Sequence, residues 1–361
     1  MKMTKTRLLA TLIGSALLSS AWLAATPAAA AEPGTIFGAG STFAKPLYES
    51  WTNSFFQKNQ GSLKFDGIGS GAGIGRFQNQ VVDFAGSDVP MSDDQLSDTK
   101  GGNKDVLHIP TAYGGIVITY NLPGFKGSLN LTGEQIALIY LGKIRNWNDP
   151  RLVAANPNLA NVSYPIIAFH RGDGSGTTFG FTSYLSVASQ DWHTTNGAAF
   201  ATIWPVGDGR GGNGPVVDAV NGNPYSIGYA DYNFAVAKKL PMASLKNASG
   251  NFVQPTLENI RQAVASAASK AQGSDDLRLN LIDASGDSSY PLVTATYIII
   301  HQHQHDASTA STLAKFLLWG LHDGQSVEAS LNYVPLPDNV VSQATKLVKS
   351  IDVNGKSALA Q

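Results

Sequence analysis

The sequence predicts an α/β protein made of two lobes that are joined by two crossover strands. Short strands are followed repeatedly by glycine-rich turns and then by helical patterns, which is typical of α/β folds. Two uncharged apolar runs, 113–120 and 292–300, indicate long strands where the chain passes between the lobes. With 361 residues, the chain is long enough to build two hydrophobic cores.

The first predicted unit begins with a strand over residues 35–38. Its turn leads into a helix whose apolar residues Phe43, Leu47, Trp51 and Phe55 recur every four positions. This spacing places all four side chains on one buried helix face.

A second unit has a predicted strand over 63–68 and a tight turn over 69–73. Its helix carries Ile74, Phe77 and Val81 as the expected buried stripe. A third strand ends in polar residues, and Asp93 and Asp94 open the next helix, where acidic side chains suit the helix dipole.

A fourth unit has a predicted strand over 164–169 and the loop sequence HRGDGSGT over 170–177. Apolar residues then recur in a helical pattern, and they are Phe179, Phe181, Tyr184 and Leu185. Residues 207–224 are rich in glycine, and we predict a flexible loop around one short helical turn.

The crossover strands divide the chain into expected domains. Residues 32–112 and 290–361 form the first lobe, and residues 113–289 form the second lobe. Residues 1–31 have the features of a Sec-type signal peptide, since cations precede an apolar run that ends in small residues. A membrane anchor is the alternative, but polar residues interrupt the apolar run.

Composition excludes several classes of function. The chain has 25 Lys and Arg against 26 Asp and Glu, and its 14% of charged residues is low, so nucleic-acid binding is not expected. Removal of residues 1–31 takes away three cations and leaves a formal charge of −4. The chain has no cysteine, which excludes disulfides, thiolate metal sites and a thiol nucleophile.

Three glycine- and hydroxyl-rich loops precede predicted helices. They lie at Ser41-Thr42-Phe43, at Ser70-Gly71 and at Ser175-Gly176-Thr177. Free backbone N–H groups and the helix dipole make such loops suitable for binding an oxyanion. Each loop taken alone is also an ordinary helix N-cap.

Two acidic residues and an arginine accompany these loops. Arg171 can bind an anion in a bidentate manner while Asp173 holds its remaining donors, although a surface salt bridge is the alternative. Asp88 would repel an oxyanion unless the ligand donates a proton to it. Such a residue accepts phosphate and disfavours sulfate, which has no proton at neutral pH. A helix-capping role for Asp88 is an equal alternative.

Six segments of the chain resemble the periplasmic phosphate-binding proteins of ABC-type phosphate transporters, in the same order and with similar spacing. They are GAGSTFAKPLYESW (38–51), GIGSGAGIGRF (67–77), DFAGSDVPMSDDQL (83–96), YLGKIRNWND (140–149), HRGDGSGTTFGFTSYL (170–185) and SIGYADYNFA (226–235).

The resemblance implies a type II-like periplasmic binding protein fold whose two crossover strands form a hinge. It also implies a non-enzymatic, monomeric protein that binds inorganic phosphate in the periplasm and delivers it to an inner-membrane ABC permease with its ATPase. Neither a cofactor nor a metal is implied. Phosphate contacts would come from Thr42, Phe43, Ser70, Asp88, Arg171, Ser175, Gly176 and Thr177, and Asp173 would orient Arg171.

Parts of the sequence also match three other kinds of site. Gly67 to Ala72 match a dinucleotide-binding fingerprint, but no second nucleotide-binding half is visible. A secreted phosphatase acting on phosphate esters is the alternative from another class, although no base accompanies Ser175 or Thr42. His301, His303 and His305 alternate as metal ligands would on a strand, but a polar strand end is the preferred interpretation.

Overall fold

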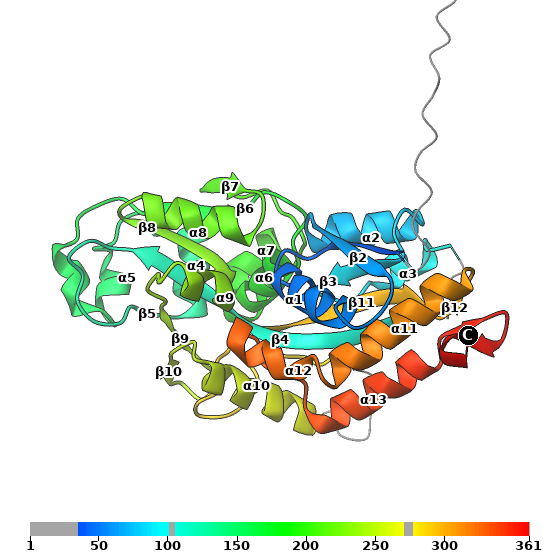
Figure 1. Cartoon of the computed structure of the whole chain (residues 1–361). Helices are drawn as coiled ribbons and strands as arrows, with labels where there is room; N and C mark the ends of the chain where they lie inside the picture. Colours follow the sequence, from blue (N-terminus) through cyan, green and yellow to red (C-terminus); the bar gives the residue numbers. More distant parts are fainter. Residues whose placement is uncertain (1–34, 101–104, 271–276, 361) are drawn as a thin grey trace, which may run out of the picture. The chain divides into compact units, whose positions relative to one another are not determined.

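The computed structural model describes residues 35–100, 105–270 and 277–360, all within one compact unit, Pro33–Gln361. Its main feature is a mixed sheet with the strand order β2-β1-β3-β11-β4-β8-β6-β7 (Figure 1). The strands are β1 (Thr35–Gly40), β2 (Ser62–Gly67), β3 (Phe84–Ser87), β4 (Val106–Asn121), β6 (Ile167–Arg171), β7 (Asp208–Arg210), β8 (Ser226–Asp231) and β11 (Val293–His301). The expected signal peptide, residues 1–31, lies outside the described residues.

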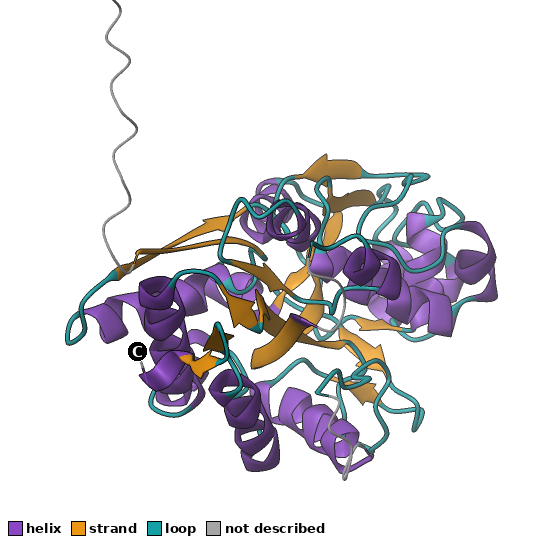
Figure 2. Ribbon diagram, turned by 90° about the vertical axis from the view of Figure 1, so that its right-hand side faces the viewer, coloured by secondary structure: helices purple, strands orange, loops and turns teal. Residues whose placement is uncertain are grey.

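The helices lie on either side of this sheet, as Figure 2 shows. The longer ones are α1 (Lys45–Phe56), α2 (Ser70–Gln78), α4 (Gly133–Tyr140), α6 (Gly176–Ala188), α8 (Asn213–Gly222), α10 (Leu257–Lys270), α11 (Ala307–Leu321) and α13 (Asp338–Lys349). The shorter ones are α3 (Asp93–Ser97), α5 (Pro150–Val153), α7 (Gln190–Thr195), α9 (Tyr232–Ala237) and α12 (Gln325–Glu328), with 3-10 turns at Pro157–Asn161, Ala329–Leu331 and Ala358–Ala360.

Two small sheets complete the fold. One has the order β10-β9-β5, and the other has the order β12-β13-β14. Their strands are β5 (Asn130–Leu131), β9 (Ser244–Lys246), β10 (Phe252–Val253), β12 (His303–Gln304), β13 (Asp352–Val353) and β14 (Lys356–Ser357).

The first predicted unit forms as expected, with β1 leading into α1. Leu47, Trp51 and Phe55 are buried on one face of α1, and Phe43 is buried in the turn before it. Strand β1 pairs in parallel with both β2 and β3, so the carboxyl ends of these three strands lie at the same edge of the sheet.

Strand β4 runs through both halves of the sheet, as a crossover strand must. Its first part, Val106 to Gly115, pairs antiparallel with β11, and its second part, Ile116 to Asn121, pairs antiparallel with β8. Figure 1 shows β4 and β11 side by side between the two groups of helices. The predicted strands over 113–120 and 292–300 are therefore present, and β4 is longer than predicted because it begins at Val106.

Two glycines fix how α1 and α10 approach this crossover strand. A Cβ on Gly114 would lie 2.5 Å from the ring of Phe43, and one on Gly115 would lie 2.7 Å from Ile260. Since real side-chain contacts are not this short, a side chain at either position would have to displace Phe43 or Ile260. Close packing on β4 thus holds the loop that carries Thr42 and Phe43.

The segment over 207–224, predicted as a loop, instead contains β7 and the regular helix α8. Val216, Val217 and Val220 form the buried face of α8, and Val216 and Val220 pack on β8 at Gly228. Local glycines and Pro215 argue against a helix, but proline is tolerated in the first turn and burial of three valines supplies the missing stability.

Two smaller expectations are also wrong. Val81 is 65% exposed and not part of the buried stripe, because α2 ends at Gln78 and the left-handed Gln80 turns the chain away. The strand predicted over 164–169 begins at Ile167, and exposed Tyr164 stacks on Tyr225 outside the sheet.

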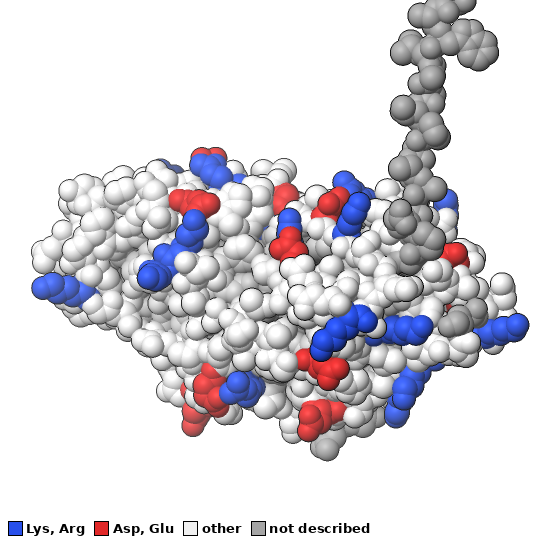
Figure 3. Space-filling model, in the orientation of Figure 1, with Lys and Arg blue, Asp and Glu red and all other residues white. Residues whose placement is uncertain are grey.

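The surface carries few charges, and those of opposite sign are interspersed over the face shown in Figure 3. Among the described residues, no helix is both long and apolar enough to cross a membrane.

Candidate anion-binding site

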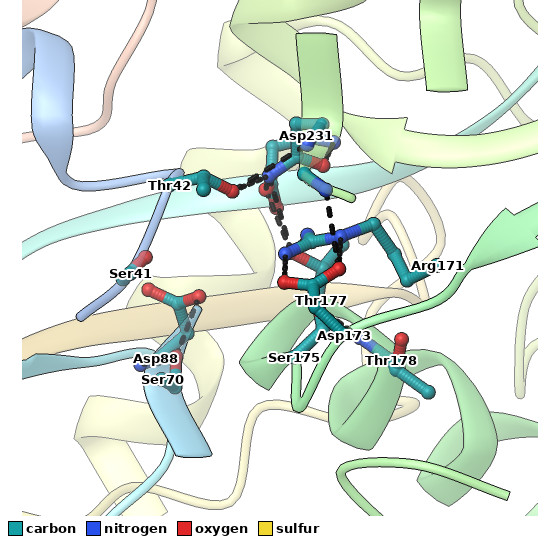
Figure 4. Close-up of polar contacts among 12 residues, drawn as sticks. Ser41, Thr42, Ser70, Asp88, Arg171, Asp173, Ser175, Thr177, Thr178 and Asp231 are labelled. Carbon is teal, nitrogen blue, oxygen red and sulfur yellow. Dashed lines mark hydrogen bonds and ion pairs between the residues drawn. The ribbon is translucent and has the colours of Figure 1, made fainter. Parts of the chain in front are cut away.

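Three loops from the starts of α1, α2 and α6 meet at one place (Figure 4). The backbone N–H of Gly71, at the start of α2, donates to the carbonyl of Gly174 just before α6, at 2.9 Å. The hydroxyl of Thr42, before α1, accepts a hydrogen bond from Asn213 of α8 at 3.0 Å. Of the sequence-predicted site residues, the structure gathers here Thr42, Ser70, Asp88, Arg171, Asp173, Ser175, Gly176 and Thr177.

Phe43, in contrast, faces the core with its side chain. Its ring packs against Tyr333 with 4.9 Å between the ring centroids, and its carbonyl accepts a hydrogen bond from the Tyr333 hydroxyl. Only the backbone N–H of Phe43 is therefore left as a possible ligand group, which is the group that the resemblance implies.

The first turn of α6 supplies free backbone donors. Ser175 is the N-cap, and its hydroxyl oxygen accepts from the N–H of Thr178 at 3.1 Å. The N–H groups of Gly176 and Thr177 precede the first intrahelical hydrogen bond and have no partner within the helix. With the Ser175 hydroxyl hydrogen, this helix start presents three donors and a positive dipole end.

Gly176 allows the two halves of the site to approach. A Cβ at this position would lie 2.6 Å from the hydroxyl of Ser70 and 2.7 Å from the Cβ of Asp88. Any larger residue would push the start of α6 away from the loop of α2.

Arg171 ends strand β6, and its guanidinium is almost completely buried. Its Nε and Nη2 donate to the two carboxylate oxygens of Asp173 at 2.7 and 2.5 Å, and its Nη1 donates to the hydroxyl of Thr177 at 3.2 Å. The backbone N–H of Gly212 donates to Asp173 as well, at 3.1 Å. Asp173 thereby fixes the orientation of the guanidinium, whose Nη1 side faces the start of α6.

Asp88 follows β3 and approaches the site from the opposite side. Its Oδ2 accepts from the hydroxyl of Ser70 at 3.3 Å, whereas its Oδ1 has no hydrogen-bond partner among the described residues. Burial raises the pKa of Asp88, and this outweighs the opposing effects of the Ser41 and Thr296 hydroxyls and of Arg171. A buried carboxyl with one free oxygen is suited to accept a proton from a ligand.

Two site residues, Asp231 and Asn213, are absent from the sequence-based prediction. Asp231 ends β8 and is completely buried, and its Oδ2 accepts from the Thr177 hydroxyl at 2.9 Å and from the Asn213 amide at 2.5 Å. An acid directly after the apolar strand YSIGYA is the signal that marks Asp231, because open α/β sheets bind ligands at strand ends. Asn213 has no such signal, since it lies in the segment predicted as a loop.

The site has more buried acid than base. Buried Asp88 and Asp231 and partly buried Asp173 lie near Arg171, the one guanidinium at the site among the described residues. Burial raises the pKa of Asp231, and repulsion from Asp88 raises it further. The arrangement therefore suits an anion that itself carries a hydrogen to donate, because such a ligand relieves the excess of acceptors.

The histidines do not form a metal cluster. His301 contacts Asp105 at 2.9 Å and His303 contacts Asp352 at 2.6 Å, as two separate pairs. No group of three potential ligands is present within residues 35–100, 105–270 and 277–360.

The glycine turn that resembles a dinucleotide fingerprint packs against protein. A Cβ on Gly69 would lie 2.6 Å from a carboxylate oxygen of Asp173 and 2.7 Å from the carbonyl oxygen of Gly174. The glycines of this turn are thus explained by the close approach of the α6 loop.

Comparisons with known proteins agree with this architecture. Residues 25–320 match the family model described as PBP superfamily domain. The chain is 38% identical to the phosphate-binding protein PstS of Haemophilus influenzae, with 86% of this chain and 92% of the relative covered. It is 36% identical to the PstS of Pasteurella multocida, with 86% and 88% covered.

A solved structure shares the fold at lower identity. A high-affinity periplasmic phosphate-binding protein, PfluDING, bound with phosphate, matches with a TM-score of 0.68 and 20% identity, covering 86% of this chain and 93% of that one. The two-lobe α/β fold predicted from the sequence is confirmed by this match and by the family model. The chain belongs to the PBP superfamily and, within it, to the family of PstS phosphate-binding proteins.

Proposed function

We propose that this protein binds inorganic phosphate in the periplasm and delivers it to an inner-membrane ABC phosphate permease with its ATPase. The observation that carries the proposal is the meeting of three helix-start loops around Arg171 and Asp88. Relatives named as phosphate-binding proteins, one of them described as periplasmic, support the same ligand and compartment. The phosphatase alternative is not supported by these relatives.

The proposed contacts follow from the donors at the site. Arg171 supplies the positive charge, and the free N–H groups at the start of α6 supply neutral donors. The hydroxyl of Ser175 retains a hydrogen that can be turned toward an anion. The hydroxyl of Ser70 donates to Asp88, and its hydrogen would turn from that carboxylate to the anion. The full set comprises Thr42, Phe43, Ser70, Asp88, Arg171, Ser175, Gly176 and Thr177, with Asp173 holding Arg171 in place.

Selectivity follows from Asp88. A protonated phosphate can donate its hydrogen to the free Oδ1 of Asp88, whereas sulfate at neutral pH has no hydrogen to donate. Sulfate would therefore place two unpaired acceptors against each other in a buried site, and its binding would be penalised.

Binding proceeds through closure of the lobes. Thr42, Ser70 and Asp88 come from the predicted first lobe, 32–112 and 290–361, and Arg171 and Thr177 come from the second, 113–289. A ligand that contacts both sets favours the closed state over an open one, because only the closed state offers all the contacts. Residues 1–31 would act as the cleaved signal peptide, and the mature chain would work as a monomer.

Calorimetric titration with phosphate, sulfate and molybdate tests the ligand. We expect tight binding of phosphate with one site per chain and no measurable binding of the other two anions. The same preparation should not hydrolyse an aryl phosphate. Binding of sulfate or molybdate in preference to phosphate, or steady turnover of the ester, would reject the proposal.

A further inference from the structure

Asp231 is a buried carboxyl group for which the proposed phosphate contacts give no role. It ends β8 with no solvent exposure, and both hydrogen bonds to its side chain fall on one oxygen, Oδ2. Its other oxygen, Oδ1, has no partner in the part of the chain that the structure describes. A buried acid of this kind usually has a function, because burying it without full hydrogen bonding destabilises the folded protein.

The hydrogen bonds around Asp231 leave the Thr177 hydroxyl with one hydrogen to donate. The Asn213 side-chain amide has two hydrogens and three acceptors within reach: Asp231 Oδ2 at 2.5 Å, Thr42 Oγ1 at 3.0 Å and Thr177 Oγ1 at 3.3 Å. The two shorter contacts take both hydrogens. Thr177 Oγ1 therefore accepts from Arg171 Nη1, at 3.2 Å, and has one hydrogen of its own to donate.

That one hydrogen has two possible uses. While Asp231 is ionised, the Thr177 hydroxyl donates to Asp231 Oδ2, and only a lone pair of Oγ1 faces an incoming anion. When Oδ2 carries a proton, the carboxyl becomes the donor and Thr177 Oγ1 the acceptor. The hydroxyl hydrogen is then released and can turn toward the anion. The proton comes from solvent, and no covalent bond of the ligand changes.

We infer that Asp231 is a positioning residue whose protonation decides whether Thr177 donates its hydroxyl hydrogen to bound phosphate. The inference rests on the proposed function, since it describes how the same site is regulated. The negative charge of ionised Asp231 also weakens phosphate binding, because a carboxylate near the anion repels it. Phosphate binding is thereby favoured when Asp231 is neutral.

The surroundings of Asp231 favour its neutral form. Burial raises its pKa most, and the charge of Asp88 raises it further, against the opposing effects of Arg171, Thr177 and Asn213. The β4 residue that pairs with it, Ile116, carries no charge. The charged or titratable groups that act on it from the neighbouring elements are Arg171 from β6, Asp88 from the loop after β3 and Tyr333 from the segment before α13. Asp173 and Tyr229 each contact Arg171.

The substitution Asp231→Asn tests this role directly. The new amide group cannot ionise, and with its NH2 at the position of Oδ2 it donates to Thr177 Oγ1, as the neutral acid does. Unlike the neutral acid, it cannot also accept from Asn213 at that position, so the effect of Asp231 is read from the change of affinity with pH. The phosphate Kd of both proteins is measured from pH 5 to pH 9. The titration of phosphate itself is the same for both, so it cancels in the ratio of the two Kd values at each pH.

We expect the ratio of the two Kd values to shift by roughly tenfold in favour of Asp231→Asn from acid to basic pH, the size of one hydrogen bond to a charged group. A ratio that does not change with pH would overturn the inference. A shift in the opposite direction would overturn it too. A purely structural role for Asp231 would produce one of these two results.

The variant Thr177→Val separates the effect of the Thr177 hydroxyl on phosphate affinity from the effect of the Asp231 charge. At basic pH, adding Asp231→Asn to Thr177→Val should improve phosphate binding clearly less than Asp231→Asn improves the wild-type protein, because only the charge effect remains and no hydroxyl can be redirected. An improvement of equal size in both backgrounds would overturn the role of the hydroxyl.

If thermal unfolding shows that Asp231→Asn does not fold, the single variant Thr177→Val still tests the inference. Thr177→Val alone should then reduce phosphate affinity strongly at acid pH and little at basic pH, and an equal loss at both would overturn the inference. Absence of phosphate binding by the wild-type protein at every pH is a different outcome. It would remove the proposed function itself.

Discussion

Among the described residues, Arg171 is the single positive charge at the site, and its removal should have the largest effect of any one residue. Arg171→Ala should weaken phosphate binding by about 2–5 kcal/mol, because it removes the cation and leaves the partly buried Asp173 without its partner. Isothermal titration calorimetry with phosphate measures the loss.

Arg210 provides a matched control for this change. It pairs with Arg171 across strands β6 and β7, but its side chain is more exposed and pairs with Asp208. Arg210→Ala should leave the phosphate Kd within a few-fold of the wild-type value. Similar losses in both variants would show that the effect is not specific to the site.

Asp88 should govern selectivity rather than overall affinity. Asp88→Asn replaces the free acceptor oxygen with an amide that can also donate, so sulfate no longer faces an unpaired acceptor. We expect the ratio of sulfate Kd to phosphate Kd to fall by at least tenfold, measured by competition calorimetry. An unchanged ratio would show that Asp88 is not the proton acceptor for the ligand.

The start of helix α6 is the element on which the geometry of the site depends most closely. Gly176→Ala would place a methyl group 2.6 Å from the Ser70 hydroxyl, so we expect phosphate affinity to fall at least tenfold as the two loops separate. Gly75→Ala on α2 is the control, because a Cβ there meets no atom within 4 Å. That variant should bind normally and be slightly more stable, since alanine favours helices. Normal binding by Gly176→Ala would contradict the close approach.

Helix α12 contains a buried acid, Glu328, outside the anion site. Its Oε1 accepts from Gln325, its Oε2 has no partner among the described residues, and burial raises its pKa well above the usual 4.5. In the unfolded chain the group ionises above pH 4.5, but in the folded protein it stays neutral to a much higher pH. The folded state therefore binds the extra proton, and stability falls as pH rises above 4.5.

Glu328→Gln should remove this dependence. Its thermal midpoint should match that of the wild-type protein near pH 4 and exceed it increasingly toward pH 8, in scans without phosphate. Glu258→Gln, at an exposed position on α10, should show no such rise. Equal midpoints of wild type and Glu328→Gln at pH 8 would show that Glu328 is ionised in the folded protein.

At the scale of elements, the sequence predicts the parts whose signal is local. The four-residue spacing of Leu47, Trp51 and Phe55 predicts α1, and the hydroxyl and glycine residues at 175–177 predict the start of α6. Helix α8 could not be predicted, because its valines are stabilised by packing on β8 rather than by local propensity. Asn213, its first residue, was missed for the same reason.

The whole molecule determines which loops meet. Asp231 and Thr177 are 54 positions apart in the sequence, and they come together because β8 lies next to β6 in the sheet. The sequence marks both residues as following strands, but it does not contain the strand order. The resemblance to phosphate-binding proteins supplied the fold, and with it the expectation that the loops converge, although it assigned no role to Asp231 or Asn213.

Closure of the whole molecule can be tested with a disulfide across the two lobes. A Cβ on Gly71 would lie 3.4 Å from the Cα of Gly174, and a Cβ on Gly174 would lie 3.5 Å from the Cα of Gly71. The two positions are therefore close neighbours, and the chain has no other cysteine that could compete for a disulfide bond between them. Gly71→Cys with Gly174→Cys should therefore cross-link only when the lobes are closed.

We expect oxidation of this double variant to be several-fold faster with phosphate present than without it, because phosphate favours the closed state. Protein oxidised with phosphate should also retain it through dialysis until a reductant is added, whereas either single-cysteine variant should release it at the wild-type rate. Non-reducing electrophoresis and a phosphate assay measure both effects. Equal oxidation rates with and without phosphate would show that the lobes meet independently of the ligand, and the binding energy would then not be coupled to a change of shape.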